Sequence, residues 1–245
     1  MDLDALLRLH AGLPRQGPGS DDATRDALRT LGPFPRGARV LDLGCGPGRA
    51  SLAVALSLDA PRILAVDLLE PFVEELRAAA AARGLSGSIE ARVADMLATG
   101  EPPASADLVV CEGAIYAVGF ERGLRAIHAL MKPGGAAAVT DLAFTGADLP
   151  PDFAAYWRAA YPAMTTVSEN VRVASAAGFD VVAARPLPAR AWWDEYYGPL
   201  EARCRALAAE PTLRDAIAST REEIDVRRRH AEAYDSVSFL LRRAR

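Results

Sequence analysis

Short apolar segments alternate with longer helical segments between residues 38 and 142, and this alternation constrains the fold most. Each apolar segment is too short for a helix and mostly lacks polar residues at its centre, which is typical of a strand buried on both faces. The segments are Ala38–Gly44, Arg62–Leu68, Ile89–Asp95, Ala106–Glu112 and Gly135–Leu142. The stretches between them have helical spacing, so the pattern predicts right-handed βαβ units. We therefore expect an α/β fold with a doubly wound, Rossmann-like parallel sheet.

The rest of the chain is less regular. The first twenty residues have no periodic pattern and end in a Gly/Pro-rich arm, after which Ser20 or Asp21 can cap a helix. Residues 152–161 and 168–177 look helical, Phe179–Leu187 and Tyr234–Arg243 look like strands, and a helical stretch covers Ala189–His230. We expect one domain over 1–245, with an N-terminal arm and helix at 1–37, a sheet core at 38–187 and 232–245, and a helical cap at 188–231.

Charge and composition exclude several classes of partner. The 28 basic and 32 acidic residues give a formal charge of −4, which argues against strong, sequence-independent binding to nucleic acid. No apolar run approaches the roughly 20 residues that span a bilayer, so we expect no membrane partner. The three cysteines form no CxxC pair, and no signal peptide is evident, which together indicate a cytoplasmic protein. Arg227–Arg229 is interpreted as a solvated helix end.

A glycine-rich turn follows the first predicted strand. Gly44, Gly46 and Gly48 separate this strand from a helix, so the turn is tight and a ligand can approach the backbone. Asp42 stands two positions before the first glycine. A carboxylate there would repel a pyrophosphate but suits a ligand that carries an ammonium group.

Further polar residues end the next strands. Asp67 ends the second strand, where a carboxylate can accept hydrogen bonds from both hydroxyls of a ribose. Asp95 and Met96 end the third strand and could lie against an adenine, and Glu112 ends the fourth. Strand ends of this kind face the crevice in which open α/β folds bind ligands.

The motifs VLDLGCGPG, AVDL and ADM, with an MKPGG turn before a strand, resemble the class I S-adenosylmethionine-dependent methyltransferases. Within that class the chain is most similar to small-molecule enzymes of the ubiquinone/menaquinone-methyltransferase type. The resemblance is firm over Ala38–Leu142, and Phe179–Leu187 and Tyr234–Arg243 match the sixth and seventh strands of the class. It implies a seven-stranded sheet with an antiparallel last strand and S-adenosyl-L-methionine as the cofactor.

The resemblance also implies residue roles. The glycines at 44, 46 and 48 would wrap the methionine part of the cofactor, and Asp42 would hold its amino group. Asp67 would bind the ribose, and Asp95 and Met96 the adenine. Leu68 and Glu112 complete the predicted cofactor-binding set.

The methyl acceptor would be held by more variable segments. Arg15 and Gln16 of the arm are candidates, and Glu112 and Tyr116 are candidate catalytic residues if a hydroxyl or ammonium acceptor needs a base. The remaining candidates share one aromatic helix face that could form core, acceptor pocket or dimer contact: Trp192, Trp193, Tyr196 and Tyr197. No cluster of metal ligands is visible.

The favoured interpretation is an enzyme that transfers the methyl group of S-adenosylmethionine to a small-molecule acceptor by in-line displacement, as a monomer or homodimer. One alternative is an amine or natural-product N-methyltransferase with an aromatic lid. Two others belong to different classes: an NAD-dependent oxidoreductase, and a catalytically silent S-adenosylmethionine-binding protein.

Overall fold

The computed structural model describes residues 3–146 and 149–244. The helices are α1 (Leu3–His10), α2 (Asp21–Leu31), α3 (Arg49–Ser57), α4 (Glu70–Ala82), α5 (Phe120–Leu130), α6 (Pro151–Ala160), α7 (Val167–Ala176), α8 (Arg190–Trp192), α9 (Gly198–Ala206) and α10 (Arg214–Arg229). The strands are β1 (Arg39–Leu43), β2 (Arg62–Asp67), β3 (Ile89–Val93), β4 (Ala106–Glu112), β5 (Met131–Phe144), β6 (Thr165–Thr166), β7 (Phe179–Pro186) and β8 (Tyr234–Arg243). Three short helical turns are η1 (Ile115–Ala117), η2 (Trp193–Tyr197) and η3 (Pro211–Leu213).

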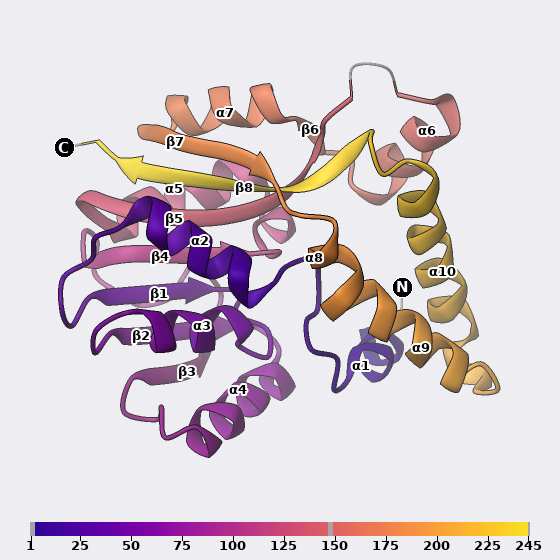
Figure 1. Ribbon diagram of the computed structural model, residues 1–245, viewed down its shortest axis with the longest axis horizontal. Coiled ribbons are helices and arrows are strands. Elements are labelled where there is room, and N and C mark those ends of the chain that lie inside the picture. The colour runs from indigo at the N-terminus through magenta and orange to yellow at the C-terminus, as the bar shows by residue number, and fades with distance from the viewer. Residues whose placement is uncertain (1–2, 147–148, 245) are drawn as a thin grey trace.

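The strands form one twisted sheet in the order β3-β2-β1-β4-β5-β8-β7 (Figure 1). Strands β1 to β5 pair in parallel, whereas β8 runs antiparallel to both β5 and β7. The short β6 pairs with the end of β5 outside this order, so the described sheet has eight strands where seven were expected. The predicted α/β fold class, with a last strand that runs antiparallel, is confirmed.

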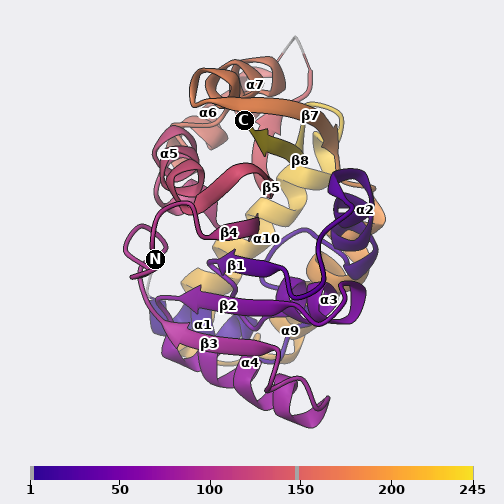
Figure 2. The same cartoon turned by 90° about the vertical axis from the view of Figure 1, so that its left-hand side faces the viewer.

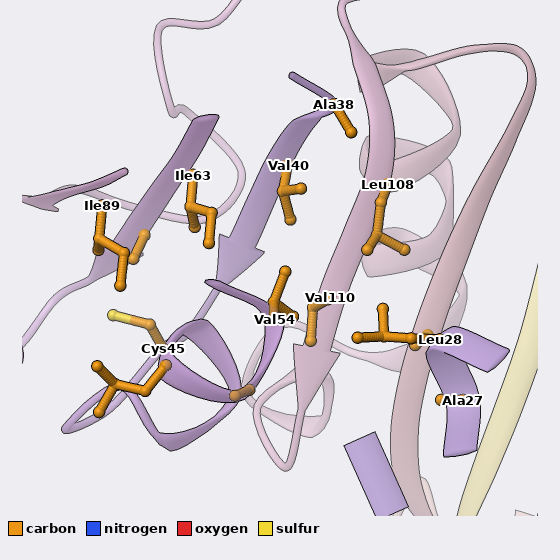
Figure 3. Packing of buried hydrophobic residues seen from close by; sticks show 14 of the residues in the cluster. Ala27, Leu28, Ala38, Val40, Cys45, Val54, Ile63, Ile89, Leu108 and Val110 are labelled. Carbon is orange, nitrogen blue, oxygen red and sulfur yellow. The ribbon is translucent and has the colours of Figure 1, made fainter. Parts of the chain in front are cut away.

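Helices cover both faces of the sheet because the strands are apolar on both faces. On one face, α2, α3 and α4 pack on a cluster that includes Val40, Ile63 and Leu108 (Figure 3). On the other face, α5 and α7 pack on a second cluster that includes Leu41, Leu64 and Val109. Consecutive residues of β1 therefore enter opposite cores, as the pleat of a strand requires. Figure 2 shows the two helical layers on either side of the sheet.

A third apolar cluster joins segments from both ends of the chain. It brings α1 together with α6, η2, α9 and α10, and Figure 1 shows α1, α9 and α10 grouped beside the sheet. The expectation that the first twenty residues lack a regular pattern is wrong at Leu3–His10, which forms α1. A helix of this length is marginal in isolation, so its burial of Ala5 and Leu9 in the third cluster stabilises it. The cap therefore includes a segment from the N-terminus.

The start of α2 is as predicted. Ser20 is its N-cap, and the Ser20 side chain accepts a hydrogen bond from the backbone amide of Ala23 at 3.1 Å. This N-cap residue marks the start of α2 and therefore the end of the N-terminal arm. Within the described residues, no helix is long and apolar enough to cross a membrane.

Gly48 lets α3 begin close to α4, and replacing it tests this packing. Gly48 has φ +87°, and a Cβ atom there would lie 2.1 Å from Cδ1 of the fully buried Leu76. We expect Gly48→Ala to lower the free energy of unfolding through two contributions, about 1–3 kcal/mol from backbone strain and about 1–3 kcal/mol from overpacking.

Gly84→Ala is the matched control, because Gly84 also has a positive φ (+68°) but its Cβ would meet nothing within 4 Å. Urea unfolding of both variants should give the larger loss for Gly48→Ala. Equal losses would contradict the packing role.

Candidate functional site

A cavity of about 480 Å³ lies at the carboxyl ends of β1, β2 and β4. Its lining comes from the N-terminal arm, the glycine-rich turn, and the loops that follow β2, β3 and β4. The predicted site residues that line it are Arg15, Gln16, Asp42, Gly44, Gly46, Asp67, Leu68, Asp95, Met96, Glu112 and Tyr116. Parallel strands bring these residues together because their carboxyl ends share one edge of the sheet.

The three glycines of the turn have different surroundings. A Cβ on Gly44 (φ +72°) would lie 2.3 Å from the Cβ of Ala114 and 3.1 Å from the Cε of Met96, so Gly44 lets the turn approach the loop after β4. Gly46 (φ +51°) faces open space, because the only atom near a Cβ would be the Cγ of Gln16 at 3.8 Å. Gly48 packs on α4 and does not line the cavity. The expectation that all three glycines surround the ligand therefore fits only the first two.

Asp42 places a buried carboxyl group at the base of the cavity. It is 2% exposed, and its Oδ2 accepts a hydrogen bond from the hydroxyl of Ser51 at 2.6 Å. Burial is the main cause that raises its pKa to about 7, and the negative charges of Glu112 and Asp67 add to the effect. A cation bound beside Asp42 would stabilise the ionised carboxylate and so offset the cost of burying it.

Asp67 fixes the glycine-rich turn to the end of β2. Its Oδ2 accepts a hydrogen bond from the amide of Gly46 at 2.9 Å, and its Oδ1 accepts one from the amide of Leu69 at 2.9 Å. The carboxylate is half-buried and borders the cavity, so its remaining lone pairs can face a ligand.

The opposite part of the lining is largely apolar. Leu68 is 67% exposed, which is unusual for a leucine that follows a buried strand, and the half-buried Met96 lies with it along the cavity. The exposed Asp95 stays beside them because its Oδ1 accepts a hydrogen bond from the amide of Leu97 at 2.8 Å. Two apolar side chains with an adjacent carboxylate suit a flat heteroaromatic ring.

Glu112 has partners that its sequence position did not reveal. Both of its oxygens accept from the hydroxyl of Thr24, at 2.8 and 3.0 Å, and its Oε2 lies 3.5 Å from Nη1 of Arg15. Burial still raises the pKa of Glu112, although the charge of Arg15 opposes the shift. The proposed base is therefore engaged with the arm and α2, and we assign it an anchoring role.

The arm is held across the site by Arg15. Its guanidinium is 7% exposed and pairs with Asp21 of α2 at 2.9 Å, Glu195 of η2 at 3.1 Å and Glu112 of β4 at 3.5 Å. Arg49 joins the same network through Asp21 and Glu195. Charge alone could have suggested that Arg15 has acidic partners, but not which of the many acidic residues they are.

The four aromatic residues of the cap do not line the cavity. Trp192, Tyr196 and Tyr197 are at most 7% exposed in the third apolar cluster, and Trp193 packs against that cluster. The structure thus corrects their assignment as substrate residues and favours the core alternative. Arg227 also differs from the sequence expectation, because it is 4% exposed and its guanidinium lies 4.1 Å from the ring centroid of Trp192. The rest of the arginine run stays exposed.

Tyr116 is a candidate catalytic residue that remains open to the cavity. It lies in η1, directly after β4, and is 57% exposed. Its ring centroid is 6.1 Å from that of Tyr161, in an edge-to-face arrangement. Partial desolvation, with the negative charges of Glu223, Asp141 and Asp67, raises the pKa of Tyr116.

Comparison with known proteins is consistent with this geometry. Residues 40–135 match the family described as "Methyltransferase domain". The structure of a SAM-dependent methyltransferase from Thiobacillus denitrificans in complex with S-adenosyl-L-homocysteine superposes with a TM-score of 0.81, is 20% identical and covers 100% of each chain. The cyclase SpnF superposes with a TM-score of 0.80 at 20% identity and covers 98% of this chain and 92% of its own.

A curated relative matches a shorter segment. Ribosomal RNA small subunit methyltransferase C of Salmonella choleraesuis is 41% identical over 71 residues, which are 29% of this chain and 20% of the relative. The chain therefore spans about a fifth of the length of the curated relatives that it matches. Residues 40–135 therefore match a methyltransferase domain, and the whole chain shares its fold with S-adenosylmethionine-dependent methyltransferases of known structure.

The Arg15 network predicts a large stability effect. Arg15→Ala would leave Glu112, 13% exposed, without its cation, and we expect it to lower the free energy of unfolding by about 3–5 kcal/mol. Arg125→Ala is the control, because the Arg125–Glu121 pair at 2.6 Å has side chains 66% and 60% exposed and should contribute about 1 kcal/mol or less. Denaturant unfolding measures both. Similar small losses would mean that the network does not stabilise the closed arm.

Proposed function

We propose that this chain is an enzyme that transfers the methyl group of S-adenosylmethionine to a small-molecule acceptor. The observation that carries the proposal is the convergence of Asp42, Gly46, Asp67 and Met96 on one cavity at the carboxyl edge of the sheet. The methyltransferase domain match over residues 40–135 supports it independently, because this segment supplies the same loops.

The residues present fit the cofactor. Gly46 leaves space where a side chain would intrude, and the buried Asp42 has no cationic partner within 4.0 Å among the described residues. Asp67 borders the cavity between this polar end and the apolar Leu68 and Met96. A ligand with an ammonium group, a ribose and an adenine would match this arrangement. Its ammonium group would lie at Asp42, its ribose at Asp67 and its adenine on the apolar surface.

In the proposed mechanism the protein binds the two reactants, orients them and excludes water from the site. When bound, S-adenosylmethionine supplies a methyl group on a sulfonium, which is already a good leaving group. Asp42 would hold the amino group, Asp67 would accept hydrogen bonds from the ribose, and the loop after β4 would border the methyl. The arm, held by Arg15, would close the site over both reactants, and such positioning can supply effective molarities of about 10⁵–10⁸ M.

Several features favour a small acceptor over a nucleic acid. The arm lines one side of the cavity and is held there by the Arg15 ion pairs, so protein covers part of the reacting region. The net charge of −4 offers no excess of cations for phosphates. The ribosomal RNA methyltransferase relative matches only 29% of this chain, so its substrate is a weak guide.

The finer assignments are also part of the proposal. We infer a small-molecule enzyme that resembles the ubiquinone/menaquinone-methyltransferase type in sequence, whatever its acceptor, and that works in the cytoplasm as a monomer or homodimer. The three cysteines are free and buried, which suits a reducing compartment.

The assay for this function is incubation with methyl-labelled S-adenosylmethionine, separately with a deproteinised metabolite extract and with ribosomal RNA. Label in a small molecule, identified by mass spectrometry, is the expected result. Label in RNA alone would overturn the small-molecule acceptor. The SpnF cyclase has the same fold, so fold alone does not guarantee transfer. Cofactor binding without label in either fraction would favour a catalytically silent binding protein.

The role of Asp67 predicts a loss of cofactor affinity. Asp67→Ala removes hydrogen bonds to a charged group worth about 1.5–3 kcal/mol, so S-adenosylhomocysteine should bind about tenfold more weakly or worse. Calorimetry measures the affinity, and melting temperature shows whether the glycine-rich turn stays folded. Asp59→Ala is the control, because Asp59 is 67% exposed and pairs only with Arg36 at 3.7 Å. Unchanged affinity in a folded Asp67→Ala protein would refute the ribose role.

The role of Asp42 predicts a pH dependence of binding. Its pKa of about 7 without ligand means that the carboxyl group is protonated at lower pH, whereas an ammonium group favours the ionised form. Affinity for S-adenosylhomocysteine should therefore fall as pH decreases below about 7, by up to about tenfold per pH unit, and level off above it. The flanking Glu112 and Asp67 raise the pKa and keep this window near neutrality.

Calorimetry between roughly pH 5.5 and 8.5 tests the dependence. Asp42→Asn should bind more weakly and lose the slope. A wild-type affinity that does not change across this range would contradict the assignment of Asp42 to the amino group.

A further inference from the structure

Tyr116 lies where the cofactor cavity meets a second set of polar side chains. Its exposed ring lines the cavity and packs edge-to-face against Tyr161 at the end of α6. The hydroxyl of Tyr161 donates a hydrogen bond to Oδ2 of Asp141 on β5 at 2.9 Å. One aromatic pair thus connects the cavity to a buried carboxylate.

Asp141 has no charge that balances it. It is 5% exposed, and its Oδ1 accepts a hydrogen bond from the amide of Leu142 at 2.9 Å. Among the described residues, no Lys, Arg or His nitrogen lies within 4.0 Å of its carboxylate. A buried carboxylate is costly unless a cation or several hydrogen bonds accompany it. Consistent with this, burial raises the pKa of Asp141 to about 6.

A second carboxylate approaches from the cap. Glu223 of α10 accepts a hydrogen bond from the hydroxyl of Tyr197 at 2.7 Å, and the described part of the chain gives it no cationic partner within 4.0 Å. The charges of both Glu223 and Asp141 raise the pKa of Tyr116, so both act on the same hydroxyl. The surroundings of Tyr116 are therefore aromatic and negative.

We propose that the acceptor is a small amine, bound as a cation with its ammonium group over the ring of Tyr116 and facing the carboxylate of Asp141. An aromatic face attracts a cation through its quadrupole, and a cation also relieves the uncompensated burial of Asp141. The inference rests on the proposed methyl transfer and names the substrate class for it. It differs from an aromatic lid, because the four aromatics of the cap are core residues and the cationic site is built from Tyr116, Tyr161 and Asp141.

The chemistry of an amine acceptor balances without a further reagent. The ammonium first releases one proton to solvent, which frees the nitrogen lone pair. That pair forms the new bond to the methyl carbon as the carbon–sulfur bond breaks and its electrons pass to sulfur. The products are an N-methylammonium, S-adenosylhomocysteine and the released proton.

A preference for an anionic acceptor would depend on Arg122. Arg122 also lines the cavity, and it could attract a carboxylate acceptor. However, its side chain is exposed and water can solvate it, whereas Asp141 is almost completely buried. A charge without a partner costs more free energy at the buried Asp141 than at the solvated Arg122. The geometry therefore favours a cationic acceptor over an anionic one.

The test is calorimetry on protein loaded with S-adenosylhomocysteine, with two sets of matched probes. One set is phenethylamine, 2-phenylethanol and 3-phenylpropionate, and the other is ethanolamine, ethylene glycol and glycolate. At least one amine should bind tenfold or more tightly than its matched alcohol. If neither amine exceeds its alcohol, or if a carboxylate binds most tightly, the inference is overturned.

Variants then locate the site. Asp141→Asn keeps an acceptor for Tyr161 and should lower amine affinity about tenfold while leaving alcohol and S-adenosylhomocysteine affinities unchanged. Tyr116→Leu should lower amine affinity, whereas Tyr116→Phe, which keeps the aromatic face, should not. Asp180→Asn, at an exposed position of β7, is the matched control and should bind like wild type. Equal amine affinity in Asp141→Asn and Asp180→Asn would overturn the assignment.

The two proposals fail in different ways. Absence of S-adenosylhomocysteine binding would overturn the proposed function, and the amines would then be titrated into the unloaded protein. Normal S-adenosylhomocysteine binding with no preference for amines would overturn only the acceptor class.

Discussion

The guanidinium of Arg15 joins three parts of the chain that are far apart in sequence. Its carboxylate partners come from α2, from the carboxyl end of β4 and from η2 of the cap. At 7% exposure, the guanidinium and its acids depend on one another, because a buried charge that loses its partner is strongly destabilising. These ion pairs hold the arm against the sheet and against η2, beside other contacts such as the hydrogen bond between Thr24 and Glu112.

The cavity carries more negative than positive charge once the Arg15 pairs are counted. Glu112 is compensated by Arg15, whereas Asp42 and Asp141 are buried with hydroxyl partners, Ser51 and Tyr161, instead of cations. In both cases burial raises the pKa. Buried carboxylates without a cation lower the stability of the free protein, and a bound cation restores that stability. This electrostatic arrangement is expected at a ligand site.

The two acids lie differently with respect to the cavity, because Asp42 lines it and Asp141 is buried outside its lining. Asp42 ends β1 under the glycine-rich turn, and Asp141 lies on β5 behind Tyr161, with Glu112 of β4 between their strands. A cofactor with an ammonium group and a cationic acceptor would therefore meet separate carboxylates. The loop after β4, which carries Tyr116, is the natural boundary between the two ligands.

How much the sequence determines can be judged from particular residues. The alternation of apolar runs was enough to predict the α/β fold, because burial on both faces leaves a local, periodic signal. The antiparallel last strand was expected only from the resemblance to the methyltransferases. The glycines and acids at strand ends were identifiable for the same reason: their position relative to a strand is local, and parallel strands bring their ends to one edge. Ser20 as the cap of α2 was likewise visible, because capping involves residues three apart.

Other features depend on which segments meet in space. Gly48 and the aromatic face at 192–197 have local patterns that fit ligand contact, but their neighbours, Leu76 and the residues of α1 and α10, make them packing residues. The short α1 was missed because its stability comes from tertiary burial. By itself, then, the sequence determined the sheet, the turn and the edge at which the cavity lies. Tertiary structure alone decided the partners of Arg15 and the isolation of Asp141, because pairing and burial of charge depend on long-range packing that no local pattern records.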